Sequence, residues 1–314
     1  MPAPPKGIVS KISKKEMSEA IKTSGYLLEQ RVEPVLTEEG FYVQMNVAYV
    51  DSETGKSREL DISAIKAISV YREEFIFPML LCECENNSQP AVFFTKESPI
   101  SFLHHEEVKV SGIPVKFWDK SVKGYMGLSD FSKMEDYHHY CKGEVATQYC
   151  SFQLKKDKSS WMALHVEEQH DTFNSLIKAL EYEISHHFYN FVLPKKGEEE
   201  GLNIQIYYPL VILQGDLYSA SLSNNRLILK KSNHIQFRKE LFLPMNNEVE
   251  TYQIDVITER YLKNYLKLID TEMEKVKRVF RRKKDHVRFS INKIVAEARK
   301  AKKKPDSYRE YFDF

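Results

Sequence analysis

Two glutamates at the end of an apolar segment are the first candidates for chemistry in this chain. Residues 80–94 read LLCECENNSQPAVFF, in which Glu83 and Glu85 follow a run of apolar residues. Side chains two positions apart on a strand point to the same side of a sheet. Two carboxylates beside apolar residues repel each other, and their burial is costly unless a cation lies between them. The pair therefore either lies in solvent at a strand end or binds a metal ion.

Two further acids precede this pair in an order that suits a single metal site. Glu29 lies at the edge of the apolar stripe of an expected helix, next to Leu36 on a helical wheel, so we expect it to face the domain. Asp61 belongs to the polar face of the expected strand RELDISA. A helix acid, a strand acid and a paired acid on the next strand can converge on one hard cation. Mg²⁺ prefers oxygen ligands and keeps several waters, so two or three carboxylates suffice.

The elements that must position these acids are those of an α/β domain. A helix is expected to begin near residues 23–24 and to stop at Gly40, although Pro34 would kink or shorten it. In the strand RELDISA, Leu60, Ile62 and Ala64 are expected on the face opposite Asp61. The remaining strands are expected over residues 41–50, 75–85, 90–95, 204–213, 217–222 and 252–257, with helices over residues 172–188 and from residue 262 onward. We therefore predict a mixed central β-sheet flanked by helices.

Three segments together resemble the core of the PD-(D/E)XK nuclease superfamily, which has the restriction-endonuclease-like fold. They are SGYLLEQRVEPVL, FYVQMNVAYVDSETGKSRELDISA and LLCECENNSQPAVFF, and they cover roughly residues 24–95. The resemblance implies that Asp61 and Glu83 bind the metal and that Glu29 is the helix acid of the family. Glu85 stands where the family usually has a lysine, which is thought to orient the attacking water and to stabilise charge on the phosphate.

The glutamate at position 85 cannot supply that positive charge. Some restriction enzymes with this pattern use Glu-x-Glu, with the second glutamate as a base or an additional metal ligand, so the resemblance implies a site of Asp61, Glu83 and Glu85. A second metal ion could replace the missing cation, and Lys96, just past the next expected strand, is another candidate for that charge.

The resemblance implies a Mg²⁺-dependent endonuclease, with Mn²⁺ as a substitute, that hydrolyses phosphodiester bonds of DNA in preference to RNA. Defence or DNA repair would be natural settings for such an enzyme. The alternative is a catalytically inactive nucleic-acid-binding or scaffold protein that keeps the fold, and a metal-dependent hydrolase of another phosphate ester is the third reading. Nuclease folds that cut both strands often dimerise, so a homodimer or larger complex is an open expectation.

The C-terminal region is strongly basic. Residues 259–304 contain 17 Lys and Arg against 6 Asp and Glu, whereas the whole chain has a net charge of +1. Such asymmetry indicates an anionic partner or a solvated helix. The expected nucleic-acid-binding residues are Lys275, Lys277, Arg278, Arg281, Arg282, Lys283 and Lys284.

Composition and motifs exclude several other classes. The chain has 42% hydrophobic residues, no long apolar stretch and no signal-peptide pattern, so we expect a cytoplasmic protein without a membrane partner. Four cysteines are too few for a disulfide framework. The histidine pairs have no zinc-site spacing and are expected to be structural or at the surface. The expected organisation is a flexible leader (1–15), a nuclease-like domain (16–258) and a basic helical region (259–314).

Overall fold

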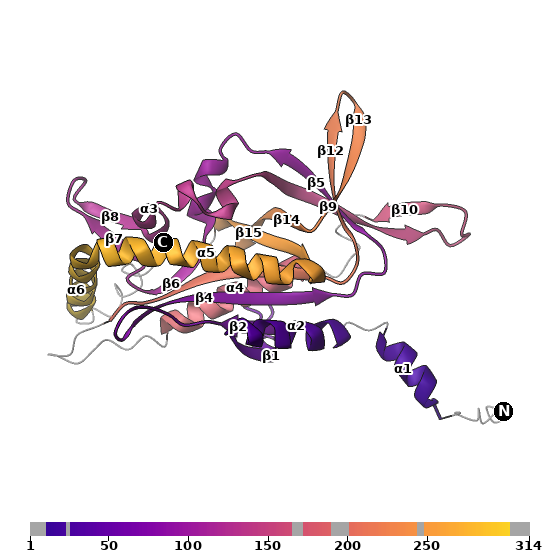
Figure 1. Cartoon of the computed structure of the whole chain (residues 1–314), viewed down its shortest axis with the longest axis horizontal. Coiled ribbons are helices and arrows are strands. Elements are labelled where there is room, and N and C mark those ends of the chain that lie inside the picture. The colour runs from indigo at the N-terminus through magenta and orange to yellow at the C-terminus, as the bar shows by residue number, and fades with distance from the viewer. Residues whose placement is uncertain (1–10, 23–25, 165–171, 190–200, 244–247, 302–314) are drawn as a thin grey trace.

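The computed structural model of the chain describes residues 11–22, 26–164, 172–189, 201–243 and 248–301, and it shows a large mixed sheet with helices on both faces (Figure 1). The helices of these ranges are α1 (Lys14–Lys22), α2 (Tyr26–Glu38), α3 (Leu128–Ser132), α4 (Thr172–Tyr189), α5 (Leu262–Arg282) and α6 (Lys284–Ala301). The first strands are β1 (Tyr42–Val50), β2 (Ser57–Ile65), β3 (Ile68–Tyr71), β4 (Glu74–Glu85), β5 (Ala91–Glu97), β6 (Val110–Ile113), β7 (Lys116–Asp119) and β8 (Gly124–Gly127). The later strands are β9 (Glu144–Leu154), β10 (Trp161–Leu164), β11 (Asn203–Leu213), β12 (Leu217–Ser223), β13 (Arg226–Ser232), β14 (His234–Leu243) and β15 (Glu248–Thr258).

The centre of the sheet is built from parallel strands. Along the main path the order is β1-β2-β4-β11-β15-β14-β9-β5-β12-β13. Residues 75–85 of β4 pair in parallel with residues 203–213 of β11, and β15 is parallel to β11 as well. Both β4 and β11 are covered on their two faces, which explains their nearly continuous apolar sequences. The carboxyl ends of these three strands consequently lie at the same edge of the sheet.

Two apolar layers cover the sheet. On one face, α2 and α5 pack against β2 and β4, and α6 packs against β7; their apolar side chains form one cluster with Ile62, Cys82 and Cys84. On the other face, α4 packs over Tyr49 and Leu81. The two cysteines therefore behave as small buried apolar side chains that face away from Glu83.

Strand β2 does not keep the simple alternation that its sequence predicts. Leu60 belongs to the layer under α4, whereas Ile62 and Ala64 belong to the layer under α2, so the expected common face of these residues is wrong. The pairs Met45–Ile62 and Val47–Leu60 flank Asn46, whose φ of 52° is left-handed. Asparagine tolerates that conformation better than most residues. This bend changes the direction of the strand at Asp61.

The sequence-based fold class of a mixed sheet flanked by helices is confirmed. Helix α2 continues through Pro34, which was expected to disturb it, and ends before Gly40. Helix α1 begins at Lys14, inside the leader expected over residues 1–15, of which the structure describes only residues 11–15. None of the described helices contains an 18-residue stretch apolar enough to span a membrane.

Candidate functional site

Asp61 and Glu83 lie side by side on neighbouring strands. The antiparallel register pairs Ile62 with Cys82, which places Asp61 opposite Glu83. The backbone N–H of Cys84 donates a hydrogen bond of 2.7 Å to Oδ2 of Asp61. A side-chain hydrogen bond also joins the carboxyl groups of Asp61 and Glu83. The structure thus brings together the two acids that the sequence assigned to metal binding.

The pair is poised to hold a proton in the absence of a cation. Burial, and after it the neighbouring carboxylates of Asp61, Glu85 and Glu29, raise the pKa of Glu83 to about 9. Burial also raises the pKa of Asp61. Oε1 of Glu83 is buried and has no hydrogen-bond partner, which is unusual for a buried polar atom and leaves an acceptor for a positive charge.

Glu29 and Glu85 flank the pair without closing on it. Glu29 is buried on α2 as expected, and its pKa is raised by burial and then by Asp61. Glu85 accepts a hydrogen bond from Oγ1 of Thr172, the first residue of α4, which directs its carboxylate toward that helix. No three of these four acids, all within the described ranges, have oxygens within 4.8 Å of one another. Asp61 and Glu83 thus form a close pair, and Glu29 and Glu85 lie farther out.

A positive charge that sequence reasoning missed lies near the end of β4. Lys96 is exposed on β5, which pairs with β9 and β12 rather than with β4. Arg31, in contrast, follows Glu29 by two residues on α2. Its guanidinium donates hydrogen bonds of 2.6 and 2.9 Å to Glu259, which raise its pKa, and Cys84 raises this pKa further. Arg31 is thereby placed close to the strand segment that carries Glu83.

A crevice opens beside the acids at the carboxyl ends of the parallel strands. It has a volume of about 410 Å³, and its charged lining residues are Arg31, Arg260 and Lys263 together with the acids Asp216 and Glu259. The backbone N–H of Gln214 donates to the carbonyl of Glu85 over 3.0 Å, which joins this crevice to the end of β4. Ligands of open α/β sheets commonly bind in such a crevice. Each of its cations already has an acidic partner: Arg31 pairs with Glu259, Arg260 with Asp216 and Lys263 with Glu38. An anionic group such as a phosphate would have to displace these carboxylates to bind there.

The loop after β4 is fixed to the loop after β11 by Asn87. Its Oδ1 accepts a hydrogen bond of 2.9 Å from the backbone N–H of Gly215, and its Nδ2 donates to the carbonyl of Gln89 over 2.9 Å. A Cβ atom at position 215 would lie 2.5 Å from the carbonyl oxygen of Asn87. The two loops therefore approach as closely as glycine permits.

Replacing Gly215 with alanine should destabilise the fold by about 1–3 kcal/mol, because the new methyl group separates the loops and breaks the Asn87 hydrogen bond. Urea unfolding measures this change. Gly127→Ala is the matched control, since the nearest atom to its Cβ is a side-chain oxygen at 3.8 Å. Equal stability of the two variants would contradict the close approach.

The basic run of residues 275–284 lies far from the acids. Arg281 donates to the carbonyl of Val70 over 3.0 Å, and Lys284 lies over the ring of Tyr71, both near the start of β4. The nine steps from Glu74 to Glu83 span roughly 30 Å at the usual rise of a strand. The run and the acid pair therefore cannot contact the same phosphate.

Most of the run is engaged by the protein itself. Lys275 lies over the ring of Tyr137, Lys277 pairs with Glu274 at 2.9 Å, and Lys283 donates to the carbonyl of Phe131 over 2.8 Å. Arg278 and Arg282 are exposed. Helix α5 lies where a helix was expected, and the side chains of the run point in different directions around it and its end.

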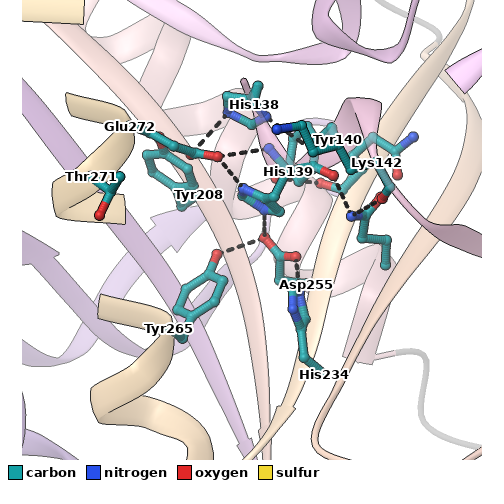
Figure 2. A network of polar contacts seen from close by, with 12 residues as sticks. His138, His139, Tyr140, Lys142, Tyr208, His234, Asp255, Tyr265, Thr271 and Glu272 are labelled. Atoms are coloured by element: carbon teal, nitrogen blue, oxygen red, sulfur yellow. Dashed lines mark hydrogen bonds and ion pairs between the residues drawn. The ribbon is translucent and has the colours of Figure 1, made fainter. Parts of the chain in front are cut away.

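A second set of ionisable residues lies buried between the sheet and α5 (Figure 2). His139, in the short 3₁₀ turn His139–Cys141, contacts two buried acids: its Nδ1 is 2.9 Å from Oε1 of Glu272, and its Nε2 is 2.9 Å from Oδ2 of Asp255. Although burial opposes it, the charges of Asp255 and Glu272 raise the pKa of His139 to about 10. An imidazolium thus bridges two carboxylates inside the core.

The outer members of this network complete its hydrogen bonds. Tyr265 donates to Asp255 over 2.6 Å, Nε2 of His234 is 2.6 Å from Oδ1 of Asp255, and Tyr208 donates to Glu272 over 3.2 Å. These groups could hold a metal, but contacts of 2.6–2.9 Å are hydrogen-bond lengths. Ligands about 2.0–2.1 Å from a tetrahedral zinc would lie farther apart than that. Hydrogen bonds, rather than a bound metal ion, therefore explain the spacing of the groups in this network.

The sequence assigned the histidine pairs to structural or surface positions, and a structural position is what His139 has. No local pattern could have joined it to Asp255 and Glu272, which are 116 and 133 residues away.

Comparison of the chain with models of known protein families, with curated proteins and with solved structures finds no match.

Proposed function

We propose that this protein is a metal-dependent nuclease that hydrolyses phosphodiester bonds. The observation that carries the proposal is the half-buried pair of Asp61 and Glu83, with a raised pKa at both carboxyls and a buried, unpartnered oxygen on Glu83. Burying two acids this close without a cation costs stability. A divalent ion would remove that cost, and all the donors are the oxygens that Mg²⁺ prefers.

The arrangement of elements supports the resemblance to the PD-(D/E)XK nucleases. Glu29 on α2, Asp61 on β2 and Glu83 on β4 follow one another in the chain and lie close enough to influence one another's pKa. We therefore propose a restriction-endonuclease-like fold for this part of the sheet. DNA is the proposed substrate and Mg²⁺ the proposed cofactor, with Mn²⁺ as a substitute.

The mechanism assigns a task to each of these side chains. Asp61, fixed by the N–H of Cys84, and Glu83, after losing its proton, would hold the metal. When bound, such an ion polarises a phosphate and lowers the pKa of a water. Glu85, whose carboxylate Thr172 fixes in place, would orient or deprotonate the attacking water. Arg31, Arg260 and Lys263 would bind a neighbouring phosphate in the crevice by exchanging their present partners Glu259, Asp216 and Glu38 for it.

One observation favours the alternative of an inactive nucleic-acid-binding protein. The side chains that raise the pKa of Glu83 are all acidic, and Glu85 stands where the nuclease family usually has its lysine. A relative that had lost catalysis would retain the fold and bind nucleic acid without cutting it. The two functions differ in whether metal-dependent cleavage occurs.

Cleavage of supercoiled plasmid and of labelled single- and double-stranded oligonucleotides tests the proposal, with Mg²⁺, with Mn²⁺ and with a chelator. We expect cutting that requires metal, favours DNA and disappears in Asp61→Ala. Because that variant is purified in the same way, cutting by it would indicate a contaminating nuclease. Salt-sensitive binding without cutting would favour the inactive alternative.

A further inference from the structure

The β12–β13 hairpin extends from the body of the protein as an arm (Figure 1). Strand β12 pairs with β5 only over residues 217–220, and its outer part has β13 as its neighbour. The six steps from Leu217 to Ser223 span roughly 20 Å at the usual rise of a strand. Asn224 and Asn225 form a two-residue turn with φ of 49° and 60°, a geometry typical of tight hairpins. The tip of the arm is therefore well defined.

One face of this arm is apolar and exposed. Leu222 and Leu227 are a cross-strand pair next to the turn, with 77% and 58% of their surface exposed, and Leu229 follows on the same face with 53%. A cluster of large exposed apolar side chains at a protruding tip is typical of an interaction site, whereas single exposed apolar residues are common on any protein surface.

The charge of the arm favours an anionic partner. Residues 217–232 include Arg226, Lys230 and Lys231 and no acidic residue. Lys231 pairs with Asp216 at the base of the arm, whereas Arg226 and Lys230 have no carboxylate partner among the residues that the structure describes. Arg226 and Lys230 alternate with Leu227 and Leu229 along β13 and therefore lie on the opposite face of the arm. Minor-groove proteins likewise combine apolar side chains, which enter between base steps, with cations that contact the DNA.

The arm starts at the edge of the sheet that carries the acid pair. The N–H of Ala91 donates to the carbonyl of Asp216 over 3.0 Å, and β11, which leads into the arm, ends beside Glu85. A duplex with a phosphate at Asp61 and Glu83 would thus extend toward the arm. A second copy of the chain fits this surface less well, because pairing of two β13 strands would oppose their cations.

We infer that the β12–β13 arm binds duplex DNA, with Leu222 and Leu227 inserted between bases and Arg226 and Lys230 on the backbone. The inference rests on the proposed function for the identity of its partner. Insertion unstacks bases and bends the duplex, so the arm would help to hold the substrate at the acid pair.

Fluorescence of a duplex that contains 2-aminopurine, together with binding anisotropy, tests the arm in chelator, where no cutting occurs. We expect the wild-type protein to raise the fluorescence, and Leu222→Ser/Leu227→Ser to abolish the rise and weaken binding about tenfold. The matched control is Phe242→Ser/Val249→Ser, an exposed apolar cross-strand pair at the opposite end of the sheet, which should bind like the wild type.

A charge variant separates backbone contacts from insertion. Arg226→Ala/Lys230→Ala should reduce the slope of log affinity against log salt concentration by about two. Unchanged duplex binding by the leucine variant would overturn the inference. Leucine-dependent binding to phosphatidylserine vesicles, or leucine-dependent dimerisation in light scattering, without a response of the duplex would do so too.

The two proposals fail separately. If the protein binds and unstacks the duplex but does not cut it with metal, the proposed role of the arm would stand and the nuclease proposal would be contradicted. If the leucine variant cuts DNA and binds it with wild-type affinity, the nuclease proposal would stand and the proposed role of the arm would be contradicted.

Discussion

Glu83→Gln should stabilise the metal-free protein at pH 8 while it abolishes cleavage. The folded-state pKa of Glu83 is raised to about 9 from an ordinary value of 4.5. A carboxyl with a raised pKa contributes stability that is present below the unfolded value and is lost as pH rises toward the folded value. In the wild type, up to about 4 kcal/mol would be lost between pH 5 and pH 8. The amide of glutamine has no proton to release and can still donate to Asp61.

Urea unfolding in chelator at pH 5 and pH 8 measures this effect. We expect the two proteins to have similar stability at pH 5 and the variant to be more stable at pH 8. Glu97→Gln, at an exposed position on β5, is the control and should change little at either pH. A wild-type stability that does not fall between these pH values would contradict the raised pKa.

The same substitution should lower Mg²⁺-dependent cleavage by at least about a hundredfold, because an amide is a poor ligand for a hard cation and does not neutralise its charge. The combination of higher stability and lost cleavage is expected of a buried active-site acid. Higher stability with cleavage unchanged would show that Glu83 is an inert buried acid. If cleavage were lost without any gain in stability at pH 8, the nuclease proposal would still hold, but the proposed energetic cost of burying Glu83 would be contradicted.

The acids could be found from the sequence because each depends on a local pattern. The period of a helix places Glu29 beside Leu36, and the period of a strand places Glu83 and Glu85 on one face and Cys84 on the other. These relations involve residues a few positions apart. Because β2 and β4 pair as neighbours in the sheet, Asp61 then comes to lie opposite Glu83.

Other features depend on geometry that no local pattern contains. The bend at Asn46 moves Leu60 and Ile62 into different apolar layers although their spacing predicts a common face. The basic run has the expected helix, but contacts with Val70 and Phe131 from distant segments decide where its side chains point. The crevice with Arg31 forms only where α2, β11 and β15 meet.

The buried histidine network predicts the largest loss of stability for a single substitution. His139→Leu should destabilise the protein by about 3–5 kcal/mol, because it leaves Asp255 and Glu272 buried without their shared cation. Urea unfolding at pH 6 measures the loss. The matched control is His104→Leu, an equally buried histidine bonded to Ser98 and to the carbonyl of Tyr140, with no acid contact. An equal loss in the two variants would contradict the ionic bridge.

The pH dependence of that loss identifies its electrostatic part. The pKa of His139 is raised to about 10 from 6.5, so its contribution is full below pH 6.5 and declines as pH rises toward 10. His139 and His234 hold the pKa of Asp255 far below its usual range despite burial, so the contribution of Asp255 is present above pH 4 and is lost in stronger acid. The difference between the wild type and His139→Leu should therefore be largest between about pH 4 and pH 6.5 and should shrink toward pH 10.

A compensating variant keeps this prediction testable if His139→Leu does not fold. Neutralising both acids as Asp255→Asn/Glu272→Gln in the His139→Leu background removes the unpaired buried charges, and it should recover part of the lost stability. Recovery would show that the histidine is required because of its two acidic neighbours. Failure to recover would instead assign the loss to packing, since His139 also stacks on His138 at a ring distance of 4.7 Å, and the leucine would not replace that contact.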